Sequence, residues 1–184
     1  MAQTPTTQIP LGFTAPSFSL PDTISGKIKS LEELKSGKAT VIMFICNHCP
    51  FVLHVKDELV KLANDYIPKG ISFIAISSND VGKYPQDGPE MMKDFAAVNK
   101  FPFPYLYDET QDVARAYSAA CTPDLNIFDG ELKCVYCGQL DDSRPSNGKP
   151  VTGKDIREAL DNLLAGKPVS DDQKPSIGCN IKWK

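Results

Sequence analysis

The sequence of 184 residues has no long hydrophobic run. A membrane-spanning helix needs roughly 20 consecutive apolar residues, and every uninterrupted apolar stretch here is far shorter. Residues 1–10 also lack the basic segment followed by an apolar segment that is typical of an export signal. We therefore expect no membrane partner and a cytoplasmic location.

An excess of charge of one sign is also absent. The 20 Lys and Arg residues nearly balance the 23 Asp and Glu residues, and no basic cluster forms a stripe that would follow a phosphate backbone. The sequence therefore argues against a nucleic-acid partner. It also lacks a Gly-rich phosphate loop, a Ser nucleophile motif and a pair of carboxylates. The length suits one globular domain with a sizeable core.

What the sequence does have is six cysteines. A chain with a large core and no export signal does not need a disulfide framework, so redox or metal chemistry explains at least some of them better. Cys46 and Cys49 form a CxxC motif between an apolar run, Thr40 to Ile45, and a segment with helical spacing. The N-terminus of a helix favours a thiolate, and this spacing lets one sulfur attack a mixed disulfide formed at the other.

The segments around the motif alternate between strand and helix patterns. Apolar residues three and four apart predict a helix after Pro50 that ends at Pro68 and Gly70, and residues 71–77 predict a second buried strand. Asp129-Gly130 predicts a hairpin, and a last helix carries Ile156 and Leu160. The loop over residues 78–88 is expected at the surface. This order predicts an α/β fold with a central mixed sheet flanked by helices and an N-terminal hairpin extension.

Three regions follow from these patterns. Residues 1–11 are polar and expected to be a flexible N-terminus. Residues 12–166 are expected to form the domain, and residues 167–184 a C-terminal tail that packs on it.

The CxxC, together with Thr122-Pro123 before a hairpin strand, resembles the thioredoxin superfamily over roughly residues 12–165. Within it the chain resembles the peroxiredoxin-like (AhpC/TSA-type) redoxin group. The residues that carry this second resemblance are Ala15-Pro16-Ser17-Phe18, Cys49-Pro50, the insertion between residue 77 and Pro123, and the ending Pro175 to Trp183. The resemblance implies a thioredoxin-like fold with Pro123 as a cis-proline opposite the CxxC, where it exposes backbone for substrate pairing.

The resemblance implies two mechanisms, which differ in the attacking cysteine. In the thioredoxin-like one, Cys46 attacks a substrate disulfide and Cys49 resolves the mixed disulfide. In the peroxiredoxin-like one, Cys49 attacks a peroxide, becomes a sulfenic acid and is resolved by Cys46, which occupies the place of a Thr or Ser in that group.

Peroxiredoxins also use an arginine, and none of the arginines here, Arg115, Arg144 and Arg157, matches its expected place near residues 124–128. We therefore predict a thiol–disulfide oxidoreductase with a redox or antioxidant role. Its partners would be protein or small-molecule disulfides, or peroxides, and an upstream thiol reductant. The protein would act as a monomer or homodimer.

The remaining cysteines have open roles. If Pro123 faces the CxxC, Cys121 lies close enough to be a third thiol, or it is a packed core residue. Cys134 and Cys137 form a second CxxC in a predicted strand, where residues three apart point to opposite faces, so a working dithiol is not expected. Cys179 is a lone thiol or a resolving one.

His48 lies between the CxxC cysteines and either stabilises a thiolate or is an exposed turn residue. Cys46, His48, Cys49 and His54 are plausible zinc ligands, but the second CxxC is badly oriented to supply a further pair, so neither a metal nor another cofactor is expected. A non-catalytic reading also stands, in which a thioredoxin-like scaffold presents residues 78–88 and 141–153 to a partner.

Overall fold

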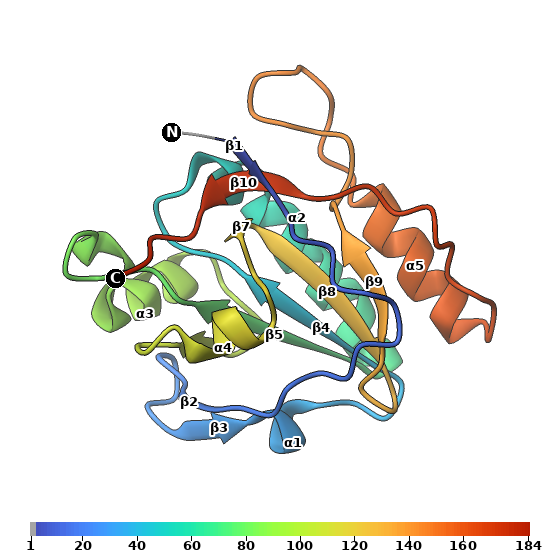
Figure 1. Ribbon diagram of the computed structural model, residues 1–184, viewed down its shortest axis with the longest axis horizontal. Helices are drawn as coiled ribbons and strands as arrows, with labels where there is room; N and C mark the ends of the chain where they lie inside the picture. Colours follow the sequence, from blue (N-terminus) through green and yellow to red (C-terminus); the bar gives the residue numbers. More distant parts are fainter. Residues whose placement is uncertain (1–2) are drawn as a thin grey trace.

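A computed structural model describes residues 3–184. Its central sheet has five strands in the order β6-β5-β4-β8-β9 (Figure 1). In that order the strands are β6 (Tyr105–Tyr107), β5 (Ile71–Ser77), β4 (Ala39–Phe44), β8 (Asp124–Asp129) and β9 (Cys134–Gly138). The first three are parallel to one another, whereas β8 is antiparallel to both β4 and β9. The predicted mixed sheet is therefore confirmed.

The unit β4-α2-β5 is a parallel pair joined by a long helix, α2 (Pro50–Tyr66). All six residues of β4 are buried, because both faces of the sheet are covered at its centre. The short helix η1 (Ile67–Lys69) ends at Gly70, whose φ of 91° is the left-handed conformation that glycine adopts without strain. The chain then turns directly into β5.

Each face of the sheet has its own core. Val41 and Met43 of β4 pack with α2, α3 (Pro89–Val98) and α5 (Lys154–Leu164). Ile42 and Phe44 point to the other face. That face is covered by α1 (Leu31–Leu34), α4 (Asp112–Ala116) and the segment leading to the predicted hairpin, β2 (Ser19–Pro21) and β3 (Ile28–Ser30). Helices therefore flank the sheet on both sides (Figure 1).

A second, small sheet crosses the end of the central one. It has the order β1-β10-β7, made of β1 (Gln3–Pro5), β10 (Ile177–Asn180) and β7 (Cys121–Thr122). The structure thus places a strand in the segment 1–11 that we expected to be flexible; residues 1 and 2 lie outside the described part. The reason is long-range pairing with β10, which a local polar composition does not reveal.

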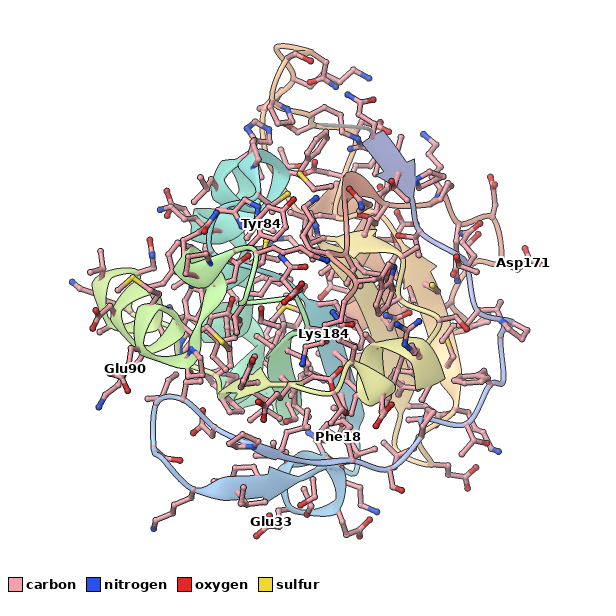
Figure 2. All side chains as sticks on the ribbon, turned by 60° about the vertical axis from the view of Figure 1, so that its left-hand side comes forward. Phe18, Glu33, Tyr84, Glu90, Asp171 and Lys184 are labelled. Atoms are coloured by element: carbon pink, nitrogen blue, oxygen red, sulfur yellow. The ribbon has the colours of Figure 1, made fainter. Side chains whose placement is uncertain are left out.

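The loop over residues 78–88 corrects another expectation. Asn79, Asp80 and Asp87 are buried, although the composition predicted a surface loop. The chain ending covers them: Asp80 N donates to Lys182 O at 2.7 Å, and Lys182 N donates to Asn79 Oδ1 at 2.9 Å. The short helix η2 (Pro85–Asp87) brings Asp87 inward. Figure 2 turns this side of the molecule forward, with Tyr84 and the terminal Lys184 on it.

Among the described residues, none of the helices is both long and apolar enough to cross a membrane.

Candidate active site

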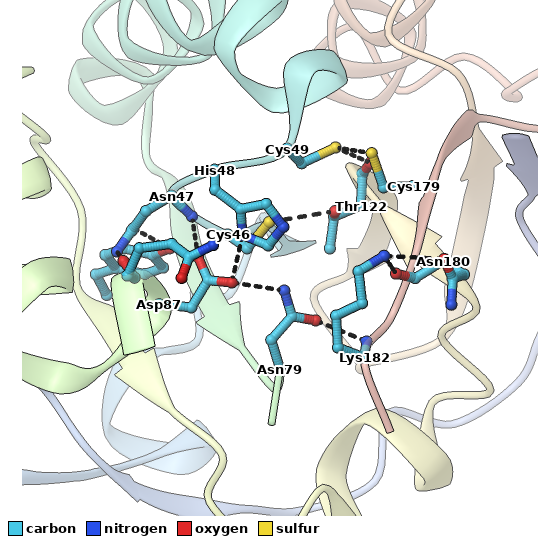
Figure 3. A network of polar contacts seen from close by, with 12 residues as sticks. Cys46, Asn47, His48, Cys49, Asn79, Asp87, Thr122, Cys179, Asn180 and Lys182 are labelled. Carbon is cyan, nitrogen blue, oxygen red and sulfur yellow. Dashed lines mark hydrogen bonds and ion pairs between the residues drawn. The ribbon is translucent and has the colours of Figure 1, made fainter. Parts of the chain in front are cut away.

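The CxxC lies where β4 passes into α2. Cys46 follows the strand by two residues, and Cys49 is the N-cap of α2, with Pro50 in the first helical position. The peptide bond between Thr122 and Pro123 is cis, and this segment lies against both thiols. Cys46 Sγ is 3.5 Å from Thr122 Oγ1 and Cys49 Sγ is 3.3 Å from Thr122 O (Figure 3). The structure therefore brings Cys46, Cys49 and the Thr122–Pro123 bond together.

The environments of the two thiols differ. A hydrogen bond from the Cys46 thiol lowers the pKa of Cys49 to about 5, with further contributions from Cys179, Thr122 and the Val52 N–H in the first turn of α2. The same hydrogen bond raises the pKa of Cys46, as do its burial and the negative charge of Asp87. Cys49 is therefore the thiol that ionises first.

A buried carboxylate organises the other side of the motif. Asp87 is fully buried and accepts from Asn47 N at 2.8 Å and from Asn79 Nδ2 at 2.9 Å. Its Oδ2 is 2.6 Å from Nδ1 of His48, whose ring stacks on Tyr84 with 5.3 Å between centroids. Because a carboxylate only accepts, Nδ1 carries the proton of this hydrogen bond. His48 is therefore held in one orientation and is not a free turn residue.

Asp87 and Asn79 were missed from the sequence. Asp87 stands in Gln86-Asp87-Gly88-Pro89, which has the composition of an exposed turn, and no local pattern indicates burial. Cys179 was left open, and the structure places it in the site. Its Sγ lies 2.7 Å from Cys49 Sγ, and its pKa is raised to about 12 by burial and by the hydrogen bond to Cys49.

None of the three arginines reaches the thiols. Arg115 stacks over Trp183, Arg144 donates to Gln139 Oε1 and nearby carbonyls, and Arg157 pairs with Glu58 and Asp65. A cation near the site comes instead from Lys182, whose charge acts on the pKa of Cys179. Its Nζ donates to both oxygens of Asn180 (Figure 3).

The second CxxC corrects a prediction. Cys134 and Cys137 face the same core, because β9 has a register irregularity against Ile127 and Phe128 that adds a residue between them. They therefore do not point to opposite faces. Burial raises the pKa of both thiols, to about 11 and about 12 respectively, so neither is a ready nucleophile.

Cys121 is also buried, and its Sγ lies 3.5 Å from Thr6 Oγ1. Burial raises its pKa to about 12. The thiol packs beside the site, and its contacts in the structure are with Thr6 and the Pro123 carbonyl.

One set of side chains has the composition of a metal site. Ligand atoms of Cys46, His48 and Asp87 lie within 4.8 Å of one another. The set differs from the one considered from the sequence, because His54 binds Ser143 and Cys49 turns to Cys179. The 2.6 Å contact between His48 Nδ1 and Asp87 Oδ2 is a hydrogen bond, which orients the histidine ring.

Comparison with known proteins places this geometry in a family. No curated protein matches the chain. An uncharacterized conserved protein from Geobacillus kaustophilus is similar at 65% identity over 100% of this chain and 97% of that one, with a TM-score of 0.99. A hypothetical protein from Sinorhizobium meliloti is similar at 46% identity over 98% of both chains, with a TM-score of 0.96.

A peroxidoxin from Mycobacterium tuberculosis, 21% identical over 86% of this chain and 98% of that one with a TM-score of 0.64, shares the fold. The sequence model of the AhpC/TSA family matches residues 11–137, which include the whole CxxC and Pro123. The chain therefore belongs to the AhpC/TSA family, as a redoxin of the thioredoxin superfamily.

Proposed function

We propose that this redoxin is a thiol–disulfide oxidoreductase in which Cys46 and Cys49 cycle between dithiol and disulfide. Membership of the AhpC/TSA family supports a redox function. The observation that carries the finer proposal is the pair of unequal thiols at the N-terminus of α2, where Cys49 has a pKa lowered to about 5 and Cys46 a raised one. A pair of this kind holds one thiolate ready to attack and one thiol in reserve.

The reaction has two exchange steps. The Cys49 thiolate attacks one sulfur of a substrate disulfide, which forms a mixed disulfide and releases the first substrate thiolate. Cys46 then loses its proton and attacks Cys49 Sγ, which forms the Cys46–Cys49 disulfide and releases the second thiolate. The substrate gains two electrons. An upstream dithiol then reduces the Cys46–Cys49 disulfide and restores both thiols. Thr122 and Pro123 form the backbone segment against which the substrate would lie.

His48 has a place in the second step. Cys46 must lose a proton although burial and Asp87 hold its pKa high. A ring nitrogen of His48 lies within 4.8 Å of Cys46 Sγ. Because Nδ1 is hydrogen-bonded to Asp87, Nε2 is the nitrogen that accepts a proton in the neutral form of the ring. His48 is thus the base that we assign to Cys46, and Asp87 is the residue that positions it.

Peroxide reduction is the second candidate. It is favoured by one observation, that the thiolate is Cys49, the cysteine that the peroxiredoxin-like mechanism requires. The absence of arginine contacts at the thiols argues against it, since all three side chains are engaged elsewhere. Hydrogen peroxide consumption by the reduced protein, compared with reduction of a low-molecular-weight disulfide, distinguishes the two.

The test is a redox titration. We expect the thiols of Cys46 and Cys49, followed by alkylation and mass spectrometry across glutathione and dithiothreitol buffers, to disappear in a two-electron transition between about −120 and −270 mV, the range of exchange proteins. Cys49→Ser should lower disulfide reduction by at least about 1,000-fold, because it removes the nucleophile. If both thiols stay alkylatable and Cys49→Ser retains activity, the non-catalytic binding module takes precedence.

A further inference from the structure

We propose that Cys179 is a third redox-active thiol, which resolves intermediates on Cys49 by forming a Cys49–Cys179 disulfide. The inference rests on the proposed function, because it needs Cys49 to react with a disulfide. It gives the C-terminal strand a part in the chemistry in addition to its packing.

The first observation is the contact itself. Cys49 Sγ and Cys179 Sγ are 2.7 Å apart, and a disulfide needs about 2.05 Å, so a small movement of the side chains brings them to bonding distance. The two residues are 130 positions apart in the sequence. Only the fold brings them together, and it does so at the thiol that ionises first.

The second observation is that β10 is fixed at this place. Cys179 is opposite Thr122 in the antiparallel pair with β7 and opposite Gln3 in the pair with β1. On either side of the strand, Ser176 Oγ donates to Pro123 O at 2.7 Å and Ile181 N donates to Ala120 O at 3.1 Å. A thiol held in this way attacks without the entropy loss of ordering a free tail.

The third observation concerns Gly178. A Cβ on this residue would lie 2.0 Å from Thr122 O and 2.6 Å from Thr122 C, so the backbone of β10 touches that of β7 with no space between them. Position 178, next to Cys179, therefore has no room for a side chain. Any larger residue forces β10 and β7 apart, which changes the position of the Cys179 thiol relative to Cys49.

The fourth observation is burial. Cys46, Cys49 and Cys179 are each 2% exposed or less, so the thiols nearest to an adduct on Cys49 are those of the chain itself. Cys46 and Cys179 are the thiols that hydrogen-bond with Cys49. Each is therefore an internal resolving thiol, and the two disulfides exclude each other because both use Cys49.

Resolution by Cys179 is a thiol–disulfide exchange in two steps. Cys49 first forms a mixed disulfide with one half of a low-molecular-weight disulfide such as oxidised glutathione. Cys179 loses its proton to solvent, and its sulfur bonds to Cys49 Sγ while the bond from Cys49 to the glutathione sulfur breaks. The glutathione thiolate leaves with the electron pair and is protonated. Two protein thiols are oxidised and one glutathione disulfide is reduced.

The experiment uses Cys46→Ser in the full chain, so that Cys179 is the remaining partner. The reduced variant is treated with oxidised glutathione, quenched with acid, alkylated and mapped by mass spectrometry without reduction. We expect an intramolecular Cys49–Cys179 disulfide with two thiols lost per chain. Adding Cys179→Ser should stop the reaction at the glutathione adduct on Cys49, with at least a tenfold loss of the intramolecular product. Cys134→Ser, which removes another buried thiol, should leave the product unchanged.

The outcomes separate this inference from the proposed function. If Cys46→Ser stops at the glutathione adduct or stays reduced, while the wild type still forms Cys46–Cys49, the function stands and the role of Cys179 is refuted. If the wild type forms no Cys46–Cys49 disulfide, the proposed function fails.

Gly178→Ala is a second variant that changes no cysteine. Combined with Cys46→Ser it should reduce the Cys49–Cys179 product at least tenfold, and alone it should retain Cys46–Cys49, with an unchanged circular dichroism spectrum as the test of folding. An unchanged yield of Cys49–Cys179 in a folded Gly178→Ala protein would count against the docking geometry.

Discussion

Cys46 and Cys49 are three positions apart, yet their surroundings shift the pKa values of the two thiols in opposite directions. Cys49 caps α2 and hydrogen-bonds with two thiols, whereas Cys46 lies beside the buried charge of Asp87. A CxxC motif alone does not say which cysteine ionises. Here the hydrogen bond between the two thiols is the largest cause, and two groups from distant parts of the chain add to it: Asp87 raises the pKa of Cys46, and Cys179 lowers that of Cys49.

A pH titration of thiolate absorbance near 240 nm tests this assignment. Because Cys49 has a pKa of about 5, its thiolate should be present at neutral pH and should disappear as the pH falls through about 5. Cys49→Ser should lose this step, and Cys134→Ser should keep it. A wild-type protein whose first thiolate appears only near the ordinary value of about 8.5 would contradict the assignment.

Among the elements, the β8-β9 hairpin is fixed against the start of β4. A Cβ on Gly130, in the hairpin turn, would lie 2.1 Å from Gly37 O, so the turn backbone packs directly on the loop that leads into β4. This contact lies at the end of the strands opposite the CxxC, since β4 runs from Ala39 beside Asp129 to Phe44 beside Asp124. It therefore bears on stability and not on the chemistry.

Gly130→Ala should destabilise the protein by about 1–3 kcal/mol, the usual effect of overpacking. Gly37→Ala is the matched control, because a Cβ there meets nothing within 4 Å and should change stability by less than about 0.5 kcal/mol. Urea denaturation of both variants measures the difference. Equal stability of the two would mean that the turn moves to make room.

For the molecule as a whole, the buried carboxyl group of Asp124 makes the free energy of unfolding depend on pH. Asp124 follows the cis-proline on β8 and is 1% exposed, and burial raises its pKa to about 7. Its hydrogen bonds from Ala120 N and Asn126 Nδ2, both 3.3 Å, offset only part of this effect. In the unfolded chain the pKa returns to its ordinary value near 3.8. The folded protein thus binds the proton more tightly, and its stability falls as pH rises from about 4 to 7.

Asp124→Asn should remove this dependence. The free energy of unfolding of the variant minus that of the wild type should grow between pH 4 and 8 by up to about 4 kcal/mol, the equivalent of the change in pKa. Asp171→Asn, at an exposed carboxylate, is the control and should follow the wild type at every pH. Urea denaturation at pH 4 and pH 8 measures both. A constant difference for Asp124→Asn would show that this carboxyl titrates normally.

The sequence by itself determined the elements whose signals are local. Apolar spacing predicts α2 and β5, Asp129-Gly130 predicts the β8-β9 turn, and the CxxC at a strand-to-helix junction points to the redox motif. These features depend on neighbours within a few residues, where periodicity and turn chemistry act.

Tertiary structure alone decided which distant groups meet that motif. The burial of Asp87, the pairing of β1 with β10 and the 2.7 Å contact of Cys179 with Cys49 depend on distant segments, and Gln3 and Cys179, which pair, are 176 positions apart. No local pattern encodes such contacts, because strand pairing and burial depend on what the rest of the chain places alongside. Local sequence therefore determines the position of the redox motif, and the fold determines the pKa values and the partners of its thiols.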